Sequence, residues 1–125
     1  MHLTAVELFD WRSYRHARFE FPVPEGKRNV ILIRAPNEHG KTSFFEAVTL
    51  GLYGRDGLPL LPRAKVVAGD GATDKLALTY SQFLEGTLHR RAIAQGRQSC
   101  GVSLEFVDDD GEPIELKRRW HFTPE

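Results

Sequence analysis

The feature that most constrains this chain is an apolar run followed by a Gly-Lys-Thr triplet and then by a second apolar segment. Val30–Ile33 is apolar at every position, which is typical of a strand buried on both faces, as in a parallel sheet. The triplet is Gly40–Thr42, and residues 41 to about 53 are apolar around most of a helix, with Gly54 placed to end it. We therefore expect a strand over 29–34, a loop, and a buried helix.

The loop between these segments fits the phosphate-binding pattern G-x-x-x-x-G-K-[ST], with Ala35 in place of the first glycine. In such a loop the backbone amides point at phosphate oxygens, the lysine reaches the β- and γ-phosphates, and the hydroxyl binds Mg²⁺. We expect Thr42 to be the Mg²⁺ ligand and a nucleotide to be the bound molecule. The expected nucleotide-binding residues of this segment are Asn37, Glu38, His39, Gly40, Lys41, Thr42 and Ser43.

Two residues of the loop fit the pattern poorly. Ala35 carries a Cβ that costs about 1–2 kcal/mol if the position must be left-handed. Glu38 places a carboxylate near phosphates, which is tolerable only if its side chain turns outward.

The flanking segments predict further strands and a second helix. Residues 1–22 alternate like two strands around a polar turn at 10–16, and residues 54–73 are rich in Gly and Pro like a loop. Asp74 is placed to cap a helix whose apolar face includes Tyr80, Phe83 and Leu84. Two alternating runs joined by an Asp-Gly turn predict a hairpin within 98–125.

Composition excludes several classes of protein. The chain has 125 residues, equal numbers of basic and acidic side chains (17 each), and a single cysteine, Cys100. This length suits one domain or less, and the balanced charge does not favour a generic DNA-coating role. One cysteine allows neither an intrachain disulfide nor a zinc cluster of several cysteines. No apolar run is long enough to span a bilayer, so no membrane partner is expected and the cytoplasm is the expected location.

The order of these parts resembles the N-terminal lobe of an ABC-type ATPase head of the SMC, RecF and SbcC superfamily. The residues that carry the resemblance are Leu3–Tyr14, Arg18–Phe21, the strand and phosphate loop, and Thr42–Gly54. Residues Tyr80–Leu84, Leu88–Ala92 and Val102–Trp120 are similar to DndD, an ATPase group linked to DNA phosphorothioation. The resemblance implies ATP and Mg²⁺ as cofactors, Arg12 near the nucleotide phosphates, and a role in DNA repair or in DNA modification and restriction.

The expected fold is α/β: the N-terminal lobe of a P-loop NTPase, with a mixed sheet, two main helices and an antiparallel hairpin subdomain. Residues 1–125 would form a partial head, divided into 1–54, a loop and helical insertion at 55–97, and a hairpin at 98–125. The superfamily hydrolyses ATP with an Asp-Glu Walker B strand and a Ser-Gly-Gly signature from a second head, and neither is found here. The resemblance thus implies a C-terminal lobe and a homodimer of heads as partners, and we expect no catalytic residue in this sequence.

Two other interpretations remain open on the sequence alone. A small P-loop kinase of a nucleotide or metabolite would use Arg90, Arg91 and Arg97 as lid residues, although its chain usually starts directly with the P-loop strand. A non-catalytic interaction module with a degenerate loop is suggested by Ala35 and Glu38. The basic runs 86–97 and 117–119 are better explained as solvated faces than as a nucleic-acid surface, so DNA is implied by the resemblance only.

Overall fold

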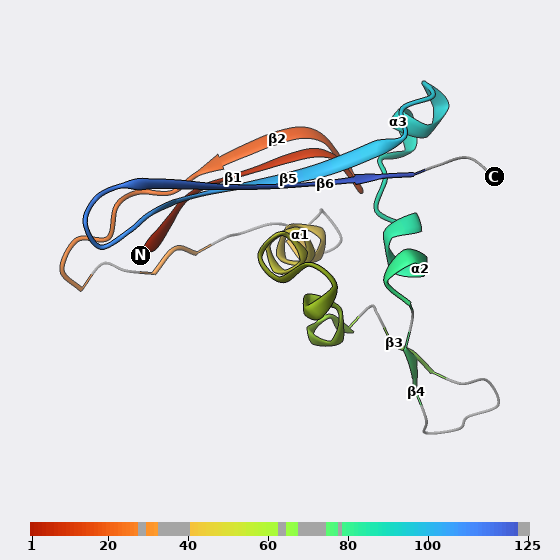
Figure 1. The fold of residues 1–125 in the computed structure, drawn as a ribbon, viewed down its shortest axis with the longest axis horizontal. Helices are drawn as coiled ribbons and strands as arrows, with labels where there is room; N and C mark the ends of the chain where they lie inside the picture. The colour runs from red at the N-terminus through yellow and green to blue at the C-terminus, as the bar shows by residue number, and fades with distance from the viewer. Residues whose placement is uncertain (28–29, 33–40, 63–64, 68–74, 78, 123–125) are drawn as a thin grey trace.

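A four-stranded antiparallel sheet forms the upper layer of the molecule in the computed structural model, which describes residues 1–27, 30–32, 41–62, 65–67, 75–77 and 79–122 (Figure 1). The strand order is β2 (Tyr14–Glu20), β1 (His2–Trp11), β5 (Ser99–Val107) and β6 (Pro113–His121). All three pairings are antiparallel. The two strands expected over 1–22 and the hairpin expected within 98–125 are therefore confirmed.

The prediction of a mixed sheet is wrong for the described part of the chain. Its parallel component was to come from a buried strand over 29–34, but Val30, Ile31 and Leu32 belong to no strand and are 86%, 47% and 73% exposed. Residues 29, 33 and 34 lie outside the described residues. A central strand needs neighbours that pair its amides and carbonyls and cover both of its faces, and none of the described strands pairs with this run.

Helix α1 (Lys41–Tyr53) lies below the sheet and confirms the predicted helix (Figure 1). It ends at Gly54, whose φ of +58° is the left-handed conformation that a helix end favours in glycine. Gly51 lets the helix approach closely, since a Cβ there would lie 3.0 Å from Val102 Cγ1. The helix buries one face rather than most of its circumference, because Phe45 and Tyr53 are 53% and 57% exposed.

The hydrophobic core fills the space between α1 and the sheet. The two central strands supply much of it, with Val6, Leu8 and Trp11 on β1 and Val102 and Leu104 on β5. Members of the core from other elements include Phe44, Leu50, Phe83 and Trp120. Burying the side chain of one such residue stabilises the fold by about 1.5–3 kcal/mol, so this single layer of packing sets the position of α1.

The segment after α1 differs from the expected loop. Residues 54–60 form a 3₁₀ helix, η1 (Gly54–Leu60), and a short strand β3 (Lys65–Val67) follows. Strand β3 pairs with β4 (Lys75–Ala77) in a separate two-stranded sheet, so the predicted helix does not start at Asp74, which itself lies outside the described residues.

The second predicted helix is shorter than expected and is divided in two. Helix α2 (Tyr80–Glu85) begins at Thr79, whose side chain accepts the Gln82 amide at 3.1 Å while the Gln82 side chain accepts the Thr79 amide at 2.9 Å. This capping box fixes the start of α2. Helix α3 (Arg90–Ala94) begins after His89, whose Nδ1 accepts the Arg91 amide. Gln82 is thus a capping residue of α2.

The outward face of the sheet is polar and its charges are paired. Arg18 bonds Glu105 at 2.6 Å and Glu20 at 3.0 Å, and His16 bonds Glu7 at 2.5 Å. Asp108, which begins the acidic run 108–110 after β5, accepts the Asp110 and Glu112 amides at 2.9 Å each, so that this run forms the hairpin turn. Among the described residues, no helix has the length and apolar character needed to cross a membrane.

The buried thiol of Cys100 gives a stability test of the core. Burial raises the pKa of the Cys100 thiol to about 11 from its ordinary 9.0, against the opposing effect of the hydrogen bond with Thr87 Oγ1 at 3.5 Å. Between pH 9 and 11 the folded chain retains a proton that the unfolded chain loses, so stability falls as pH rises through this window. Between pH 9 and pH 11, we expect the free energy of unfolding, measured by urea titration at each pH, to fall by about 2 kcal/mol more in the wild type than in Cys100→Ala. Equal losses in the two proteins would contradict this.

Candidate nucleotide-binding site

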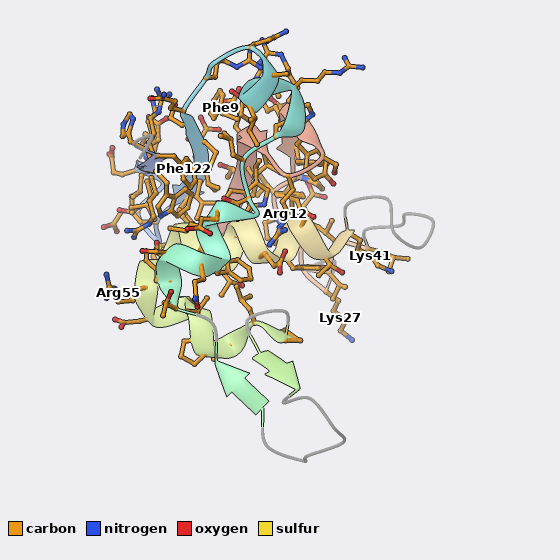
Figure 2. The ribbon with its side chains drawn as sticks, turned by 90° about the vertical axis from the view of Figure 1, so that its right-hand side faces the viewer. Phe9, Arg12, Lys27, Lys41, Arg55 and Phe122 are labelled. Atoms are coloured by element: carbon orange, nitrogen blue, oxygen red, sulfur yellow. The ribbon has the colours of Figure 1, made fainter. Side chains whose placement is uncertain are left out.

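The start of α1 presents the described part of the predicted phosphate loop. Lys41 and Thr42 are exposed in the first turn, and Lys41 projects away from the helix, whereas Ser43 is buried at 7% exposure (Figure 2). The first amides of a helix have no intrahelical acceptor, and the helix dipole adds positive potential there. The first-turn amides, the Lys41 ammonium group and the Thr42 hydroxyl therefore belong to one helix end, which is a chemistry suited to phosphate and Mg²⁺.

The other predicted residues of the loop, Asn37, Glu38, His39 and Gly40, together with Ala35, lie outside the described residues. Of the predicted site residues, the structure therefore describes Arg12, Lys41, Thr42 and Ser43.

Arg12 lies against α1 rather than in a solvated turn (Figure 2). Its Nε is 3.1 Å from Glu46 Oε1, its Nη1 donates to the Gly86 carbonyl at 3.1 Å, and its guanidinium lies 5.1 Å from the centre of the Phe83 ring. The Glu46 side chain is only 2% exposed and that of Arg12 18%. Because Glu46 is four residues after Thr42, both lie on one helix face, about one turn of 5.4 Å apart. The ion pair thus stands close to the first turn of α1.

Trp11 forms a second link to the start of α1. Its indole is fully buried, and Nε1 donates to the Ser43 carbonyl at 2.9 Å. The ring also lies 5.3 Å from that of Trp120 on β6. The turn between β1 and β2 therefore contacts α1 through both Trp11 and Arg12.

The backbone of this turn is held in a conformation that costs energy. Asp10 and Arg12 have φ values of 50° and 48°, each a left-handed conformation that costs a non-glycine residue about 1–2 kcal/mol. The Arg97 guanidinium donates two hydrogen bonds to the Asp10 carboxylate, at 3.1 and 3.2 Å. The His89 amide donates to the Asp10 carbonyl at 2.8 Å. The Arg12 amide donates to Thr87. The helical segment after β4 therefore holds the turn that contacts α1.

Sequence patterns did not predict that Asp10, Trp11, Glu46 and Arg97 take part in the contacts between the β1–β2 turn and the start of α1. One signal was present, because an acid in the middle of a helix that is otherwise apolar needs a cationic partner when the helix is buried. Nothing local in the sequence indicates that Arg12 supplies it, because the two residues come together only in the tertiary structure.

The basic runs do not form a cationic stripe among the described residues. Arg118 turns inward and donates from Nε to the Gly51 carbonyl at 3.2 Å, and Lys117 pairs with Glu115 at 3.4 Å. Arg97 is engaged by Asp10, and the Arg90 side chain is outside the described part. Arg97 and Arg118 thus make structural contacts rather than lying on the solvated faces expected for these runs, whereas the Lys117 side chain is 73% exposed.

The comparisons with known proteins match this arrangement to a class. The first turn of α1 carries Lys41 and Thr42, the last two residues of the phosphate-loop pattern. The family model described as AAA domain matches residues 5–124, and the chain belongs to this family of AAA ATPases. No curated protein matches the chain. Membership of an AAA domain implies nucleotide binding, commonly with Mg²⁺.

The ion pair between Arg12 and Glu46 gives a test of the described geometry. Removing the partner of a buried charge is strongly destabilising, so we expect Arg12→Ala to lower the unfolding free energy by about 3 kcal/mol. Glu46→Gln in the Arg12→Ala background should recover part of this loss, giving a coupling energy of about 1 kcal/mol or more in a double-mutant cycle. Urea denaturation measures all four proteins, and strictly additive losses would contradict the pairing.

Proposed function

We propose that this chain is the ATP-binding N-terminal lobe of an SMC-like ATPase head, of the DndD kind, that acts in DNA repair or in DNA modification and restriction. The observation that carries the proposal is the open first turn of α1, where Lys41 and Thr42 stand exposed in a chain of the AAA domain family. Lys41 would bind the β- and γ-phosphates and Thr42 would hold Mg²⁺, while the loop residues Asn37–Gly40 would supply further amides. The cytoplasm is the proposed compartment.

Arg12 keeps a proposed place near the phosphates. Its guanidinium is already directed to the α1 face that carries Thr42, through the ion pair with Glu46. Because the Glu46 carboxylate offsets its charge, Arg12 would act on the phosphates mainly by holding the α1 face that carries Thr42.

Hydrolysis is proposed to require parts that this sequence does not contain. Phosphoryl transfer depends on positioning and on charge stabilisation around the whole phosphate, so a lysine, a hydroxyl and amides bind without completing the reaction. A Walker B Asp-Glu and a signature segment would come from a C-terminal lobe and from a second head. The chain alone is proposed to bind ATP weakly and not to turn it over.

An apolar surface beside α1 supports a C-terminal lobe as a partner. A hollow of about 220 Å³ is lined by Leu3, Phe21, Ile31, Phe44, Phe45 and Val48. Next to it, Val30 and Leu32 are also exposed. Exposed apolar patches of this kind mark interaction sites in soluble proteins. In the described part of the chain no strand pairs with the apolar run at 30–32, and a second lobe would supply the neighbours that its sequence pattern favours.

The alternative of a small P-loop kinase is less well supported. The strand pair β1 and β2 precedes the phosphate loop, whereas such kinases usually start with the P-loop strand. Arg97, one of three candidate lid residues, is held on Asp10 and so is not available to close over an acceptor.

Calorimetric titration with ATP and ADP tests the nucleotide site. We expect Lys41→Ala to weaken ATP binding by roughly 10- to 100-fold, because it removes a charge-assisted contact worth about 1.5–3 kcal/mol. Lys117→Ala is the matched control, since it removes an exposed lysine from the outer sheet face and should leave the affinity unchanged. No heat with either nucleotide would favour the non-catalytic interaction module, and ATP turnover by the chain that Lys41→Ala abolishes would contradict the proposed need for further motifs.

The metal ligand has its own test. Thr42→Ala removes the hydroxyl but leaves the backbone amides, so we expect ATP affinity in Mg²⁺ to fall to about the value measured in EDTA. A persistent gain from Mg²⁺ in Thr42→Ala, in the same titration, would show that another group holds the ion.

A further inference from the structure

The indole of Trp11 is placed to control the first turn of α1. Its Nε1 donates at 2.9 Å to the carbonyl of Ser43, the residue that directly follows the exposed Lys41 and Thr42. The bond is fully buried, so water does not compete with it. It is therefore a fixed contact from the sheet to the residues that carry the nucleotide-binding groups.

The other end of this contact is equally fixed. Trp11 stands between Asp10 and Arg12, both left-handed, and its backbone forms a bridge with Leu88. Arg97 holds the Asp10 carboxylate, and Arg12 is bonded to the carbonyls of Gly86 and Thr87. With both neighbours held, the indole has one orientation relative to the sheet.

We propose that Trp11 is a positioning residue for nucleotide binding, which it serves through the Ser43 carbonyl. A helix can rotate or slide slightly over an apolar surface at little cost, whereas a directed hydrogen bond permits only a narrow range of angles. The bond between Trp11 and Ser43 fixes where the Lys41 and Thr42 groups lie along the α1 axis and how they are rotated about it, relative to the sheet. A phosphate-binding group must be held within about 0.5 Å of its productive place, so this constraint raises affinity without any contact between Trp11 and the ligand. The inference rests on the proposed nucleotide site.

Trp120 supplies a matched control. It is the only other tryptophan of the chain, it is also buried, and its Nε1 donates to Tyr80 Oη at 2.6 Å. Its ring lies in the same contact with Trp11, 5.3 Å between centroids. A Phe at either position thus alters the same ring contact and removes one indole hydrogen bond, but only Trp11→Phe releases α1.

The experiment is a calorimetric titration of the 125-residue chain and its two variants with Mg²⁺-ATP, at a temperature where circular dichroism shows all three folded. We expect Trp11→Phe to raise the dissociation constant about fivefold and Trp120→Phe to leave it within about twofold of the wild type. A purely structural role would lower the melting temperatures of both variants without separating their affinities. Equal affinities in the two variants would overturn the inference.

Fluorescence gives a second reading that does not require Trp11→Phe to fold. In Trp120→Phe the only indole is Trp11, and saturating ATP should change its emission because the bonded Ser43 carbonyl lies beside the occupied turn. An unchanged emission at saturation would also overturn the inference. Absence of any binding by the wild type would remove the proposed function and the inference together, whereas wild-type binding with no effect of Trp11→Phe and no change in emission would remove the inference alone.

Discussion

The packing of α1 on one face of the antiparallel sheet is the constraint on which the rest of the structure depends. The helix must bury Phe44, Ala47 and Leu50 while its first turn stays open to solvent. Gly51 allows the close approach at the far end, where a Cβ would meet Val102 at 3.0 Å and where Arg118 bonds the Gly51 carbonyl. At the near end Trp11 bonds the Ser43 carbonyl. One helix is therefore fixed at both ends by side chains of the sheet.

The strained turn between β1 and β2 connects this packing to the helical segment after β4. Two left-handed residues cost about 1–2 kcal/mol each, and such strain persists only where surrounding contacts over-determine the conformation. Arg97 and the His89 amide supply those contacts at Asp10, and Phe83 and the Gly86 carbonyl supply them at Arg12. The segment 79–97 therefore acts as a brace for the turn, and through the turn for the start of α1.

Local sequence patterns predicted the elements whose stability is local. Three such predictions are confirmed: the strand pair from the alternation in 1–22, the hairpin from the Asp-Gly turn near Gly111, and the helix end from the glycine at position 54. The prediction of a helix capped by Asp74 was wrong because it relied on the spacing of apolar residues. In the structure the capping box of Thr79 and Gln82 places the start of α2 five residues later. Among the described residues, the motif predicts Lys41, Thr42 and Ser43 as site residues and the resemblance implies Arg12, and their binding of nucleotide stays a prediction. Glu46, Asp10 and Arg97 depend on contacts between residues distant in sequence, which no spacing reveals.

The exposed run at 30–32 and the proposed need for Walker B and signature motifs both indicate a second lobe. An apolar, β-branched run is stable as a strand only when neighbours cover it, and Val30 and Leu32 are 86% and 73% exposed. In the proposed head, a C-terminal lobe that covers this surface would also bring the Walker B carboxylates to the open turn of α1. The covering of the apolar hollow beside α1 and the completion of the phosphate site would then be one event. Nucleotide hydrolysis would thereby depend on assembly, because the free energy that joins the lobes also positions the groups that the reaction needs.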